Sequence, residues 1–201
     1  MTNFAKNIKM HRIAEAWIPT ERAKFKMITY SHESDDRMPN IAFIHENADI
    51  NKPIYVRIHS ECLTGDLFGS LRCDCGPQLE KSKEIIADKE GIIIYLRQEG
   101  RGIGLIKKLE AYNLQDKGID TVDANLILGF HSDERDYSDA LDILKDLGIK
   151  EIILLTNNPD KIDAFEGSGI KILRRESLIM ESTNENEKYL QAKKDRMGHL
   201  I

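Results

Sequence analysis

The stretch GIIIYLRQEGRGIGL, residues 91–105, joins an apolar run to a glycine-rich segment. Its first six residues are mostly apolar and include three consecutive isoleucines, which predicts a buried strand. The loop QEGRGIG follows, and a helix is expected from about Leu105 to Leu114. This alternation continues toward the C-terminus, with a helix from Ser138 to Gly148, strands over 151–156 and 169–173, and a short helix beginning at Asn158–Pro159. Strands that alternate with helices favour a partly parallel sheet.

The N-terminal part has a different pattern, in which short apolar-alternating runs are separated by polar turns. These runs cover residues 11–19, 24–30, 41–46 and 54–59, and they are typical of antiparallel strands. A helix is expected from near Pro77 to Gly91, and the polar tail 181–194 is expected to form a loop and a helix. We therefore predict a single α/β domain over residues 1–201, whose mixed sheet has N-terminal antiparallel strands and a C-terminal βα portion.

Composition narrows the possible functions. The 201 residues include 29 Lys and Arg against 34 Asp and Glu, a formal net charge of −5. A mildly acidic chain does not suit a general nucleic-acid binder, so any anionic ligand must be held by a local cluster of cations. No apolar run approaches the roughly 20 residues that cross a bilayer, and the N-terminus lacks the apolar core of a signal peptide. We therefore expect a cytoplasmic protein with no membrane or nucleic-acid partner.

The three cysteines, Cys62, Cys73 and Cys75, lie in one short segment with the spacing Cys-x10-Cys-x-Cys. Thiolates are soft ligands that select zinc, and a helix beginning near Pro77 would favour anionic sulfur at its N-terminus. With no fourth cysteine, the spacing favours a catalytic zinc site that keeps a position for water. His59 could instead close a structural site, and three buried thiols acting as small apolar groups are the simplest alternative. Glu61 is a candidate base close to the metal.

A zinc-dependent nucleobase deaminase is another possibility, because His59-Ser60-Glu61 matches the first half of the signature H-x-E followed by P-C-x-x-C. The second half does not match, since the later cysteines are spaced Cys-x-Cys and Pro77 follows them.

Three further segments indicate a ligand. Gly100, Gly102 and Gly104 lie between the predicted strand and helix, where backbone N–H groups often bind phosphate, although a tight turn would explain them equally well. Glu99 and Arg101 beside these glycines favour a ligand site. The segments DERD, residues 133–136, and TNNPDK, residues 156–161, lie where ligands collect beyond strand ends, although DERD could also be a solvated charge run.

Seven motifs, taken in order, resemble GTP cyclohydrolase II from about residue 10 to the C-terminus. They are RIHSECLTGD (57–66), SLRCDCGPQLE (70–80), LRQEGRGIGL (96–105), LQDKGIDTVDAN (114–125), LGFHSDERDY (128–137), LLTNNPDK (154–161) and RMGHLI (196–201). His131-Ser132 and the tail ESTNENEKYL depart from the usual pattern. The chain is too short for the version with an appended dihydroxybutanone-phosphate synthase module, so the standalone form is expected.

The resemblance implies an α/β enzyme that opens the imidazole ring of GTP and releases formate and pyrophosphate. The product would be 2,5-diamino-6-(5-phosphoribosylamino)pyrimidin-4(3H)-one, formed in the first step of riboflavin biosynthesis. The family is usually a homodimer with one Zn2+ per subunit, and Mg2+ accompanies the triphosphate. The activity is that of a hydrolase acting on the C–N bonds of cyclic amidines.

The resemblance also implies site residues, matched position by position. The zinc ligands match Cys62, Cys73 and Cys75, and the GTP contacts match Arg57, Ile58, His59, Ser60, Glu61, Gln78, Glu99, Gly100, Arg101, Thr121, Thr156 and Lys161. The proton acceptor matches Asp133, the proposed nucleophile matches Arg135, and the catalytic tyrosine matches Tyr112. Relatives without this tyrosine stop at a formamide, so Tyr112 favours full deformylation. Because a guanidinium is a poor nucleophile, Arg135 could equally clamp the α-phosphate.

Overall fold

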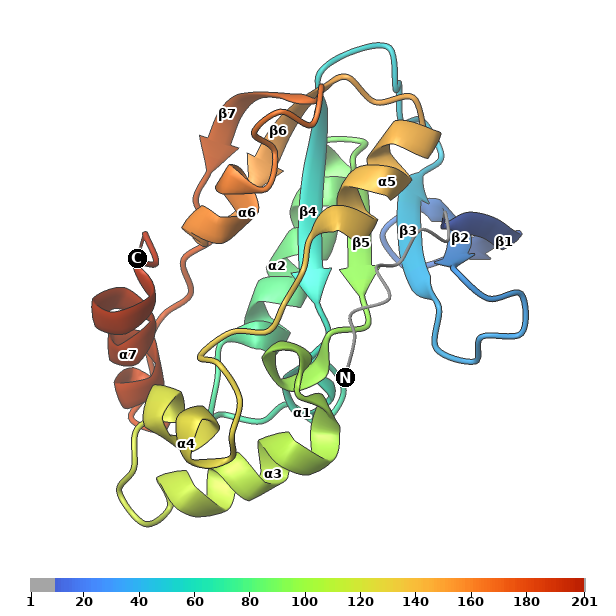
Figure 1. Ribbon diagram of the computed structural model, residues 1–201. Helices are drawn as coiled ribbons and strands as arrows, with labels where there is room; N and C mark the ends of the chain where they lie inside the picture. The colour runs from blue at the N-terminus through green and yellow to red at the C-terminus, as the bar shows by residue number, and fades with distance from the viewer. Residues whose placement is uncertain (1–9, 201) are drawn as a thin grey trace.

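The computed structural model describes residues 10–200, and its centre is one seven-stranded mixed sheet with the order β1-β2-β3-β5-β4-β6-β7 (Figure 1). The strands are β1 (His11–Pro19), β2 (Lys24–Ser31), β3 (Asn40–His45), β4 (Ile54–Ser60), β5 (Ile92–Leu96), β6 (Glu151–Leu155) and β7 (Lys171–Glu176). The helices are α1 (Leu63–Asp66), α2 (Cys75–Asp88), α3 (Gly104–Gln115), α4 (Thr121–Ile127), α5 (Ser138–Asp146), α6 (Pro159–Asp163) and α7 (Glu187–Met197), with a 3-10 turn η1 (Glu99–Gly102).

The mixed α/β sheet confirms the predicted fold class, with one correction. Strands β1, β2 and β3 are antiparallel, and β3 pairs antiparallel with β5. The strand expected over 54–59 as part of the antiparallel group is β4, which instead runs parallel to both β5 and β6. The chain leaves β4 through α1 and α2 and then enters the neighbouring β5, and such a crossover connection makes the two strands parallel.

Two apolar clusters cover the two faces of the central strands. Along β5, Ile92, Ile94 and Leu96 belong to the larger cluster, which includes buried residues of α5, whereas Ile93 belongs to a smaller cluster with Ile86 of α2. Figure 1 accordingly shows α5 in front of β4 and β5 and α2 behind them. This alternation explains why the run at 91–96 is apolar on both sides, as expected for a strand buried between helices.

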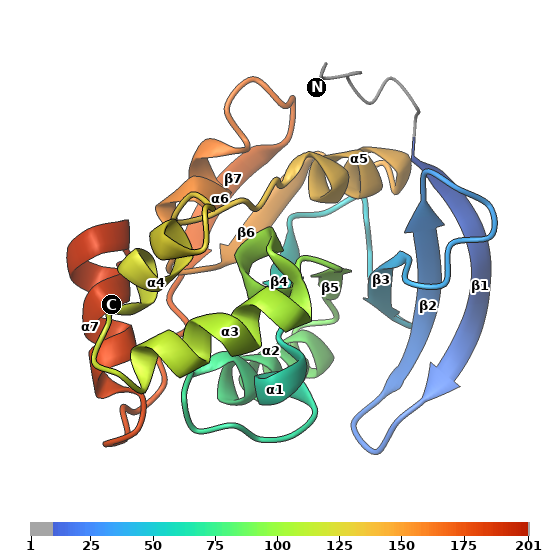
Figure 2. The same cartoon turned by 60° about the horizontal axis from the view of Figure 1, so that its bottom comes forward.

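The short helices α1 and α4 are the elements that were not predicted from the sequence. The helix α1 is too brief to show a period, but α4 had a usable start signal, because the Asp120 side chain accepts hydrogen bonds from the N–H groups of Val122 and Asp123 at 2.7 and 3.0 Å. The second view shows α3, α4 and α7 along one side of the molecule, away from β1 and β2 (Figure 2). Within residues 10–200, no helix has the length and apolar character needed to cross a bilayer.

Gly91 is required where α2 turns into β5. A Cβ built at this position would lie 2.5 Å from the carbonyl oxygen of Tyr55 and 2.6 Å from Ile86 Cδ1. We expect Gly91→Ala to lower the free energy of unfolding by about 1–3 kcal/mol, because the added methyl must displace backbone. Denaturant titration measures the change, with Lys89→Ala on the exposed surface of the same turn as control. Equal stability of the two variants would contradict this account of the contact.

Candidate metal and anion site

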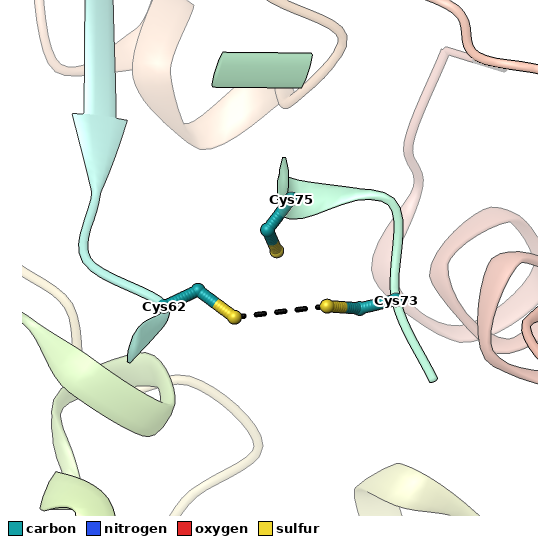
Figure 3. A group of neighbouring side chains, drawn as sticks. All are labelled: Cys62, Cys73 and Cys75. Atoms are coloured by element: carbon teal, nitrogen blue, oxygen red, sulfur yellow. Dashed lines mark hydrogen bonds between the residues drawn. The ribbon is translucent and has the colours of Figure 1, made fainter. Parts of the chain in front are cut away.

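The three cysteine side chains come together at the end of β4 that leads into α1. Cys62 precedes α1, Cys73 lies in the loop before α2, and Cys75 is the first residue of α2. The sulfur atoms of Cys62 and Cys73 are 3.6 Å apart, and all three sulfurs lie within 4.8 Å of one another, with the thiol groups pointing toward a common centre (Figure 3). Within residues 10–200, this is the group of His, Cys and acidic side chains that could hold a metal ion.

Two glycines create the space for this cluster. A Cβ on Gly65 would lie 3.1 Å from Cys73 Sγ and 3.2 Å from Cys62 Sγ, and a Cβ on Gly76 would lie 2.4 Å from the carbonyl oxygen of Gly65. The backbones of α1 and α2 therefore touch directly beside the sulfurs. Three converging soft donors in a mostly buried site fit a zinc ion, so the predicted ligands Cys62, Cys73 and Cys75 are suitably placed.

Lys108 on α3 is the main residue near the cysteines that the sequence analysis did not single out. Its Nζ lies 3.1 Å from Cys62 Sγ and 2.8 Å from Glu99 Oε1. The pKa of the Cys62 thiol is lowered by hydrogen bonds from the neighbouring thiols of Cys73 and Cys75 and by the positive charge of Lys108. Cys62 thus favours the thiolate, which is the form that binds metal. The hydrogen bond with Cys62 in turn raises the pKa of the Cys73 thiol and of the Cys75 thiol. Lys108 lies far from the cysteines in the sequence, and no motif there predicts its contact with Cys62.

His59 lies outside the metal-binding group, so the alternative in which it closes a four-ligand site is not supported. The buried His59 ring places Nε2 3.0 Å from Asp66 Oδ1. Asp66 also accepts hydrogen bonds from the Cys62 N–H and from the Tyr95 hydroxyl, at 3.0 and 2.9 Å. Asp66 therefore links β4, β5 and the first cysteine, and His59 contributes to this support.

Two adjoining cavities collect almost all of the predicted site residues. We call the one that contains the three cysteines the cysteine cavity and its neighbour the cation cavity. The cysteine cavity is lined by Glu61, Glu99, Gly100, Tyr112 and Thr121. The cation cavity is lined by Arg57, His59, Gln78, Thr156 and Lys161. Both cavities are lined by Ser60, Cys75, Arg101 and Arg135.

Two predicted residues line neither cavity. The Ile58 side chain belongs to the apolar core, and only its carbonyl oxygen takes part in the site, where it accepts a hydrogen bond from Lys161 Nζ at 2.8 Å. Asp133 acts through Arg135, whose Nε donates to Asp133 Oδ1 at 2.8 Å and whose Nη2 also pairs with this carboxylate. Desolvation is the largest single effect on Asp133 and would raise its pKa, but the hydrogen bonds and the positive charge of Arg135 together outweigh it and lower that pKa.

Several positively charged side chains line the cation cavity, and few carboxylates lie beside them. Burial lowers the pKa of Arg57 to about 10, and burial together with the charges of Arg57 and Arg135 holds the pKa of Lys161 well below its usual value. Arg57 Nε and Arg101 Nη2 are buried and have no hydrogen-bond partner among the described residues. Buried donors are nearly always paired, so these two atoms indicate a ligand that accepts hydrogen bonds. An anion with several oxygen atoms meets that need.

The glycine-rich loop is shaped to present Arg101. Arg101 has φ of +61° between Gly100 at +63° and Gly102 at +92°, so three consecutive residues adopt the left-handed conformation. A non-glycine residue in this region is strained, and such strain is commonly found at functional sites. The Arg101 carbonyl accepts a hydrogen bond from the N–H of Glu134 at 3.0 Å, which anchors the loop to the DERD segment.

The acidic and amide groups of the site mainly hold other side chains. Glu99 accepts from the N–H groups of Leu63 and Gly100 at 2.6 and 2.7 Å, in addition to Lys108. Gln78 accepts from Arg57 Nη2 at 2.7 Å and donates to Asp74. Glu61 pairs with Arg97 at 2.8 Å, and burial raises its pKa although Arg97 opposes this effect.

Comparison with known proteins identifies a family for this chain. Residues 11–177 match the family GTP cyclohydrolase II. The chain belongs to this family. Riboflavin biosynthesis protein RibBA of Bacillus subtilis (strain 168) is 49% identical over 194 residues, 96% of this chain and 48% of the relative. RibBA of Chlorobium phaeovibrioides is 47% identical over 194 residues, 96% of this chain and 47% of the relative.

The chain therefore spans about half the length of the curated relatives that it matches. Among solved structures, the crystal structure of RibBX, a two-domain 3,4-dihydroxy-2-butanone 4-phosphate synthase from A. baumannii, covers 88% of this chain and 42% of its own, with 18% identity and a TM-score of 0.46. That likeness is too slight to indicate a common fold. The family assignment rests on the sequence matches alone.

The contact between Gly65 and Gly76 provides a test of the metal centre. We expect Gly76→Ala to weaken zinc binding by about tenfold or more, because the new methyl pushes α2 and Cys75 away from α1 and Cys62. Competition with a colorimetric chelator measures the affinity, and thermal unfolding of the zinc-free chain shows how far the fold itself is affected. Glu80→Ala, at an exposed position of the same helix, is the control. Zinc affinity within twofold of wild type in Gly76→Ala would refute this role for the contact.

Proposed function

We propose that this protein is a GTP cyclohydrolase II that opens the imidazole ring of GTP and releases formate and pyrophosphate. The product is 2,5-diamino-6-(5-phosphoribosylamino)pyrimidin-4(3H)-one, and the reaction is the first step of riboflavin biosynthesis. One observation carries the proposal: a three-thiol cluster opens into a cavity that shares Arg101 and Arg135 with a second cavity rich in buried cations. A purine with a polyphosphate tail has the complementary chemistry.

The cofactor is one zinc ion per subunit, held by Cys62, Cys73 and Cys75. When bound, zinc would supply a Lewis acid and an activated water for hydrolysis at C8 of the base. We propose that Mg2+ accompanies the triphosphate, as is usual for nucleotide substrates. The thiolates require a reducing compartment, which supports a cytoplasmic location, and the family resemblance supports a homodimer.

The two cavities divide the substrate between them. The base is proposed to enter the cysteine cavity, which Tyr112 and Thr121 line together with the metal ligands. The phosphates are proposed to occupy the cation cavity and to accept hydrogen bonds from Arg57 Nε and Arg101 Nη2, the donors that lack protein partners. Lys161 adds a third cation and Thr156 a hydroxyl group. Because Glu99 and Gln78 already bind neighbouring groups, they are proposed to position the loop and Arg57 for the substrate.

Arg135 is proposed to clamp the α-phosphate. Burial is the largest single effect and would lower the pKa of Arg135, but the hydrogen bond to Asp133 and the neighbouring negative charges together outweigh burial and raise that pKa. A guanidinium held in this ion pair stays protonated and lacks the lone pair that a nucleophile needs. Held by Asp133, the guanidinium of Arg135 presents fixed, charged N–H donors to a phosphate. These donors stabilise the negative charge that develops on the phosphate during the reaction. A covalent role would require proton transfer to Asp133, the family's proton acceptor, and the low pKa of Asp133 opposes that transfer.

Tyr112 is proposed to move a proton during release of formate. It lies on α3 in the cysteine cavity, and the Arg72 guanidinium is 4.8 Å from its ring centroid. Burial raises the pKa of Tyr112 to about 12, so the hydroxyl remains protonated at neutral pH and can act as a proton donor.

The overall reaction has distinct products that can be measured. With zinc-loaded protein, GTP and Mg2+, we expect formate and pyrophosphate in equal amounts and no ammonia. Formate dehydrogenase, pyrophosphatase-coupled phosphate detection and glutamate dehydrogenase measure the three products. A protein in which zinc has been removed and then restored is the control. Ammonia without formate would indicate a deaminase and refute the proposal, as would the absence of all three products.

Tyr112→Phe tests the second hydrolysis separately from the first. We expect formate release to fall by about 10²-fold or more, the usual contribution of a general acid or base, while GTP is still consumed. A formamide product should then accumulate, which mass spectrometry detects. Tyr55→Phe, which removes a hydroxyl from β4 outside both cavities, is the control. Unchanged formate release by Tyr112→Phe would contradict the assigned role.

A further inference from the structure

The C-terminal segment, α7 with residues 198–200, packs against the site, although it lies beyond the matched range of residues 11–177. Both views show α7 beside α4 (Figures 1 and 2). Arg196 of α7 pairs with Asp120, the cap of α4, and its Nη2 lies 2.9 Å from Asp123. The segment therefore packs against α4, whose first residue is Thr121.

Lys193 connects this helix to the cysteine loop. Its buried Nζ donates to Asp74 Oδ1 at 2.6 Å, and Asp74 lies between Cys73 and Cys75. The same Nζ lies 4.6 Å from the ring centroid of Tyr189, one turn earlier on α7. One carboxylate and one aromatic face thus hold this ammonium group in the wall of the cation cavity.

His199 follows α7 and also lines the cation cavity. Its N–H donates to the carbonyl of Lys193 at 3.1 Å, and the next N–H, of Leu200, donates to the carbonyl of Asn157 at 2.9 Å. The backbone is therefore fixed to the loop that follows β6. The ring atom Nε2 of His199 is buried and has no hydrogen-bond partner among the described residues.

The surroundings of this imidazole are positively charged. Burial lowers the pKa of His199 to about 3, and the charges of Lys193, Arg135 and Lys161 add to this effect. A neutral imidazole keeps one N–H donor. Lys193 and His199 face the same cavity as Arg57, Arg101, Arg135 and Lys161, so the C-terminal segment adds two nitrogen-bearing side chains to four cationic ones from other parts of the chain.

We infer that Lys193 and His199 bind phosphate oxygens of the nucleotide, so that the C-terminal segment forms one wall of the triphosphate site. The identity of the ligand as GTP rests on the proposed function. The general recognition of a polyphosphate rests on the cavity itself, because several buried cations and unpaired donors converge there without an anion of equal charge. The polar tail that departs from the family pattern thus leads into residues that contact the substrate.

Calorimetric titration of zinc-loaded protein with GTP, guanosine and inorganic tripolyphosphate tests the inference. We expect Lys193→Met and His199→Ala each to weaken GTP and tripolyphosphate binding by about tenfold and to leave guanosine binding within twofold of wild type. Under turnover, KM for GTP should rise more than kcat falls. Lys193→Arg should restore most of the lost affinity, and Lys194→Met, at an exposed position of α7, is the control.

Two outcomes would overturn the inference. The first is tripolyphosphate affinity within twofold of wild type in both Lys193→Met and His199→Ala. The second is an equal loss for guanosine and tripolyphosphate together with loss of zinc, which would show that the segment only supports the fold. Failure of the proposed function has a different signature: wild-type protein would bind tripolyphosphate through Lys193 but release no formate from GTP.

Discussion

The parallel pairing of β4 with β5 and β6 is the constraint on which the site depends. Parallel strands end at the same edge of the sheet, so the segments that follow them meet there. Cys62 follows β4, Arg101 follows β5, and the segment 156–161 follows β6. The antiparallel strands β1, β2 and β3 extend the sheet on the other side of β5. Chemistry is therefore concentrated at one end of three neighbouring strands.

The second feature is the local separation of charge in a chain that is acidic overall. Buried or half-buried carboxylates each hold one cation in place: Asp74 holds Lys193, Asp133 holds Arg135 and Glu99 holds Lys108. These pairs fix the cations without neutralising the cavity, since Arg57, Arg101 and Lys161 have no carboxylate partner among the described ion pairs. The formal charge of −5 is thus compatible with a strongly cationic binding site.

Much of this arrangement could be predicted from the sequence, and the exceptions have physical reasons. The strands over 11–19 and 24–30 and the helix at Ser138 were readable because their apolar periods are strong. The parallel direction of β4 was not readable, because a strand buried on both faces shows the same composition in either direction. Lys108, Lys193 and His199 were not predicted because a lysine or histidine at a site is the same residue type as one on the surface.

The sequence by itself determined the α/β class, the cysteine spacing and the family motifs, since these depend on local order along the chain. Only the tertiary structure decided that His59 turns to Asp66, that Glu99 is engaged by Lys108, and that the C-terminal segment reaches the cation cavity. Each of these is a contact between segments far apart in sequence or a choice among equivalent partners. Such choices depend on how sheet and helices pack, which no short stretch of sequence records.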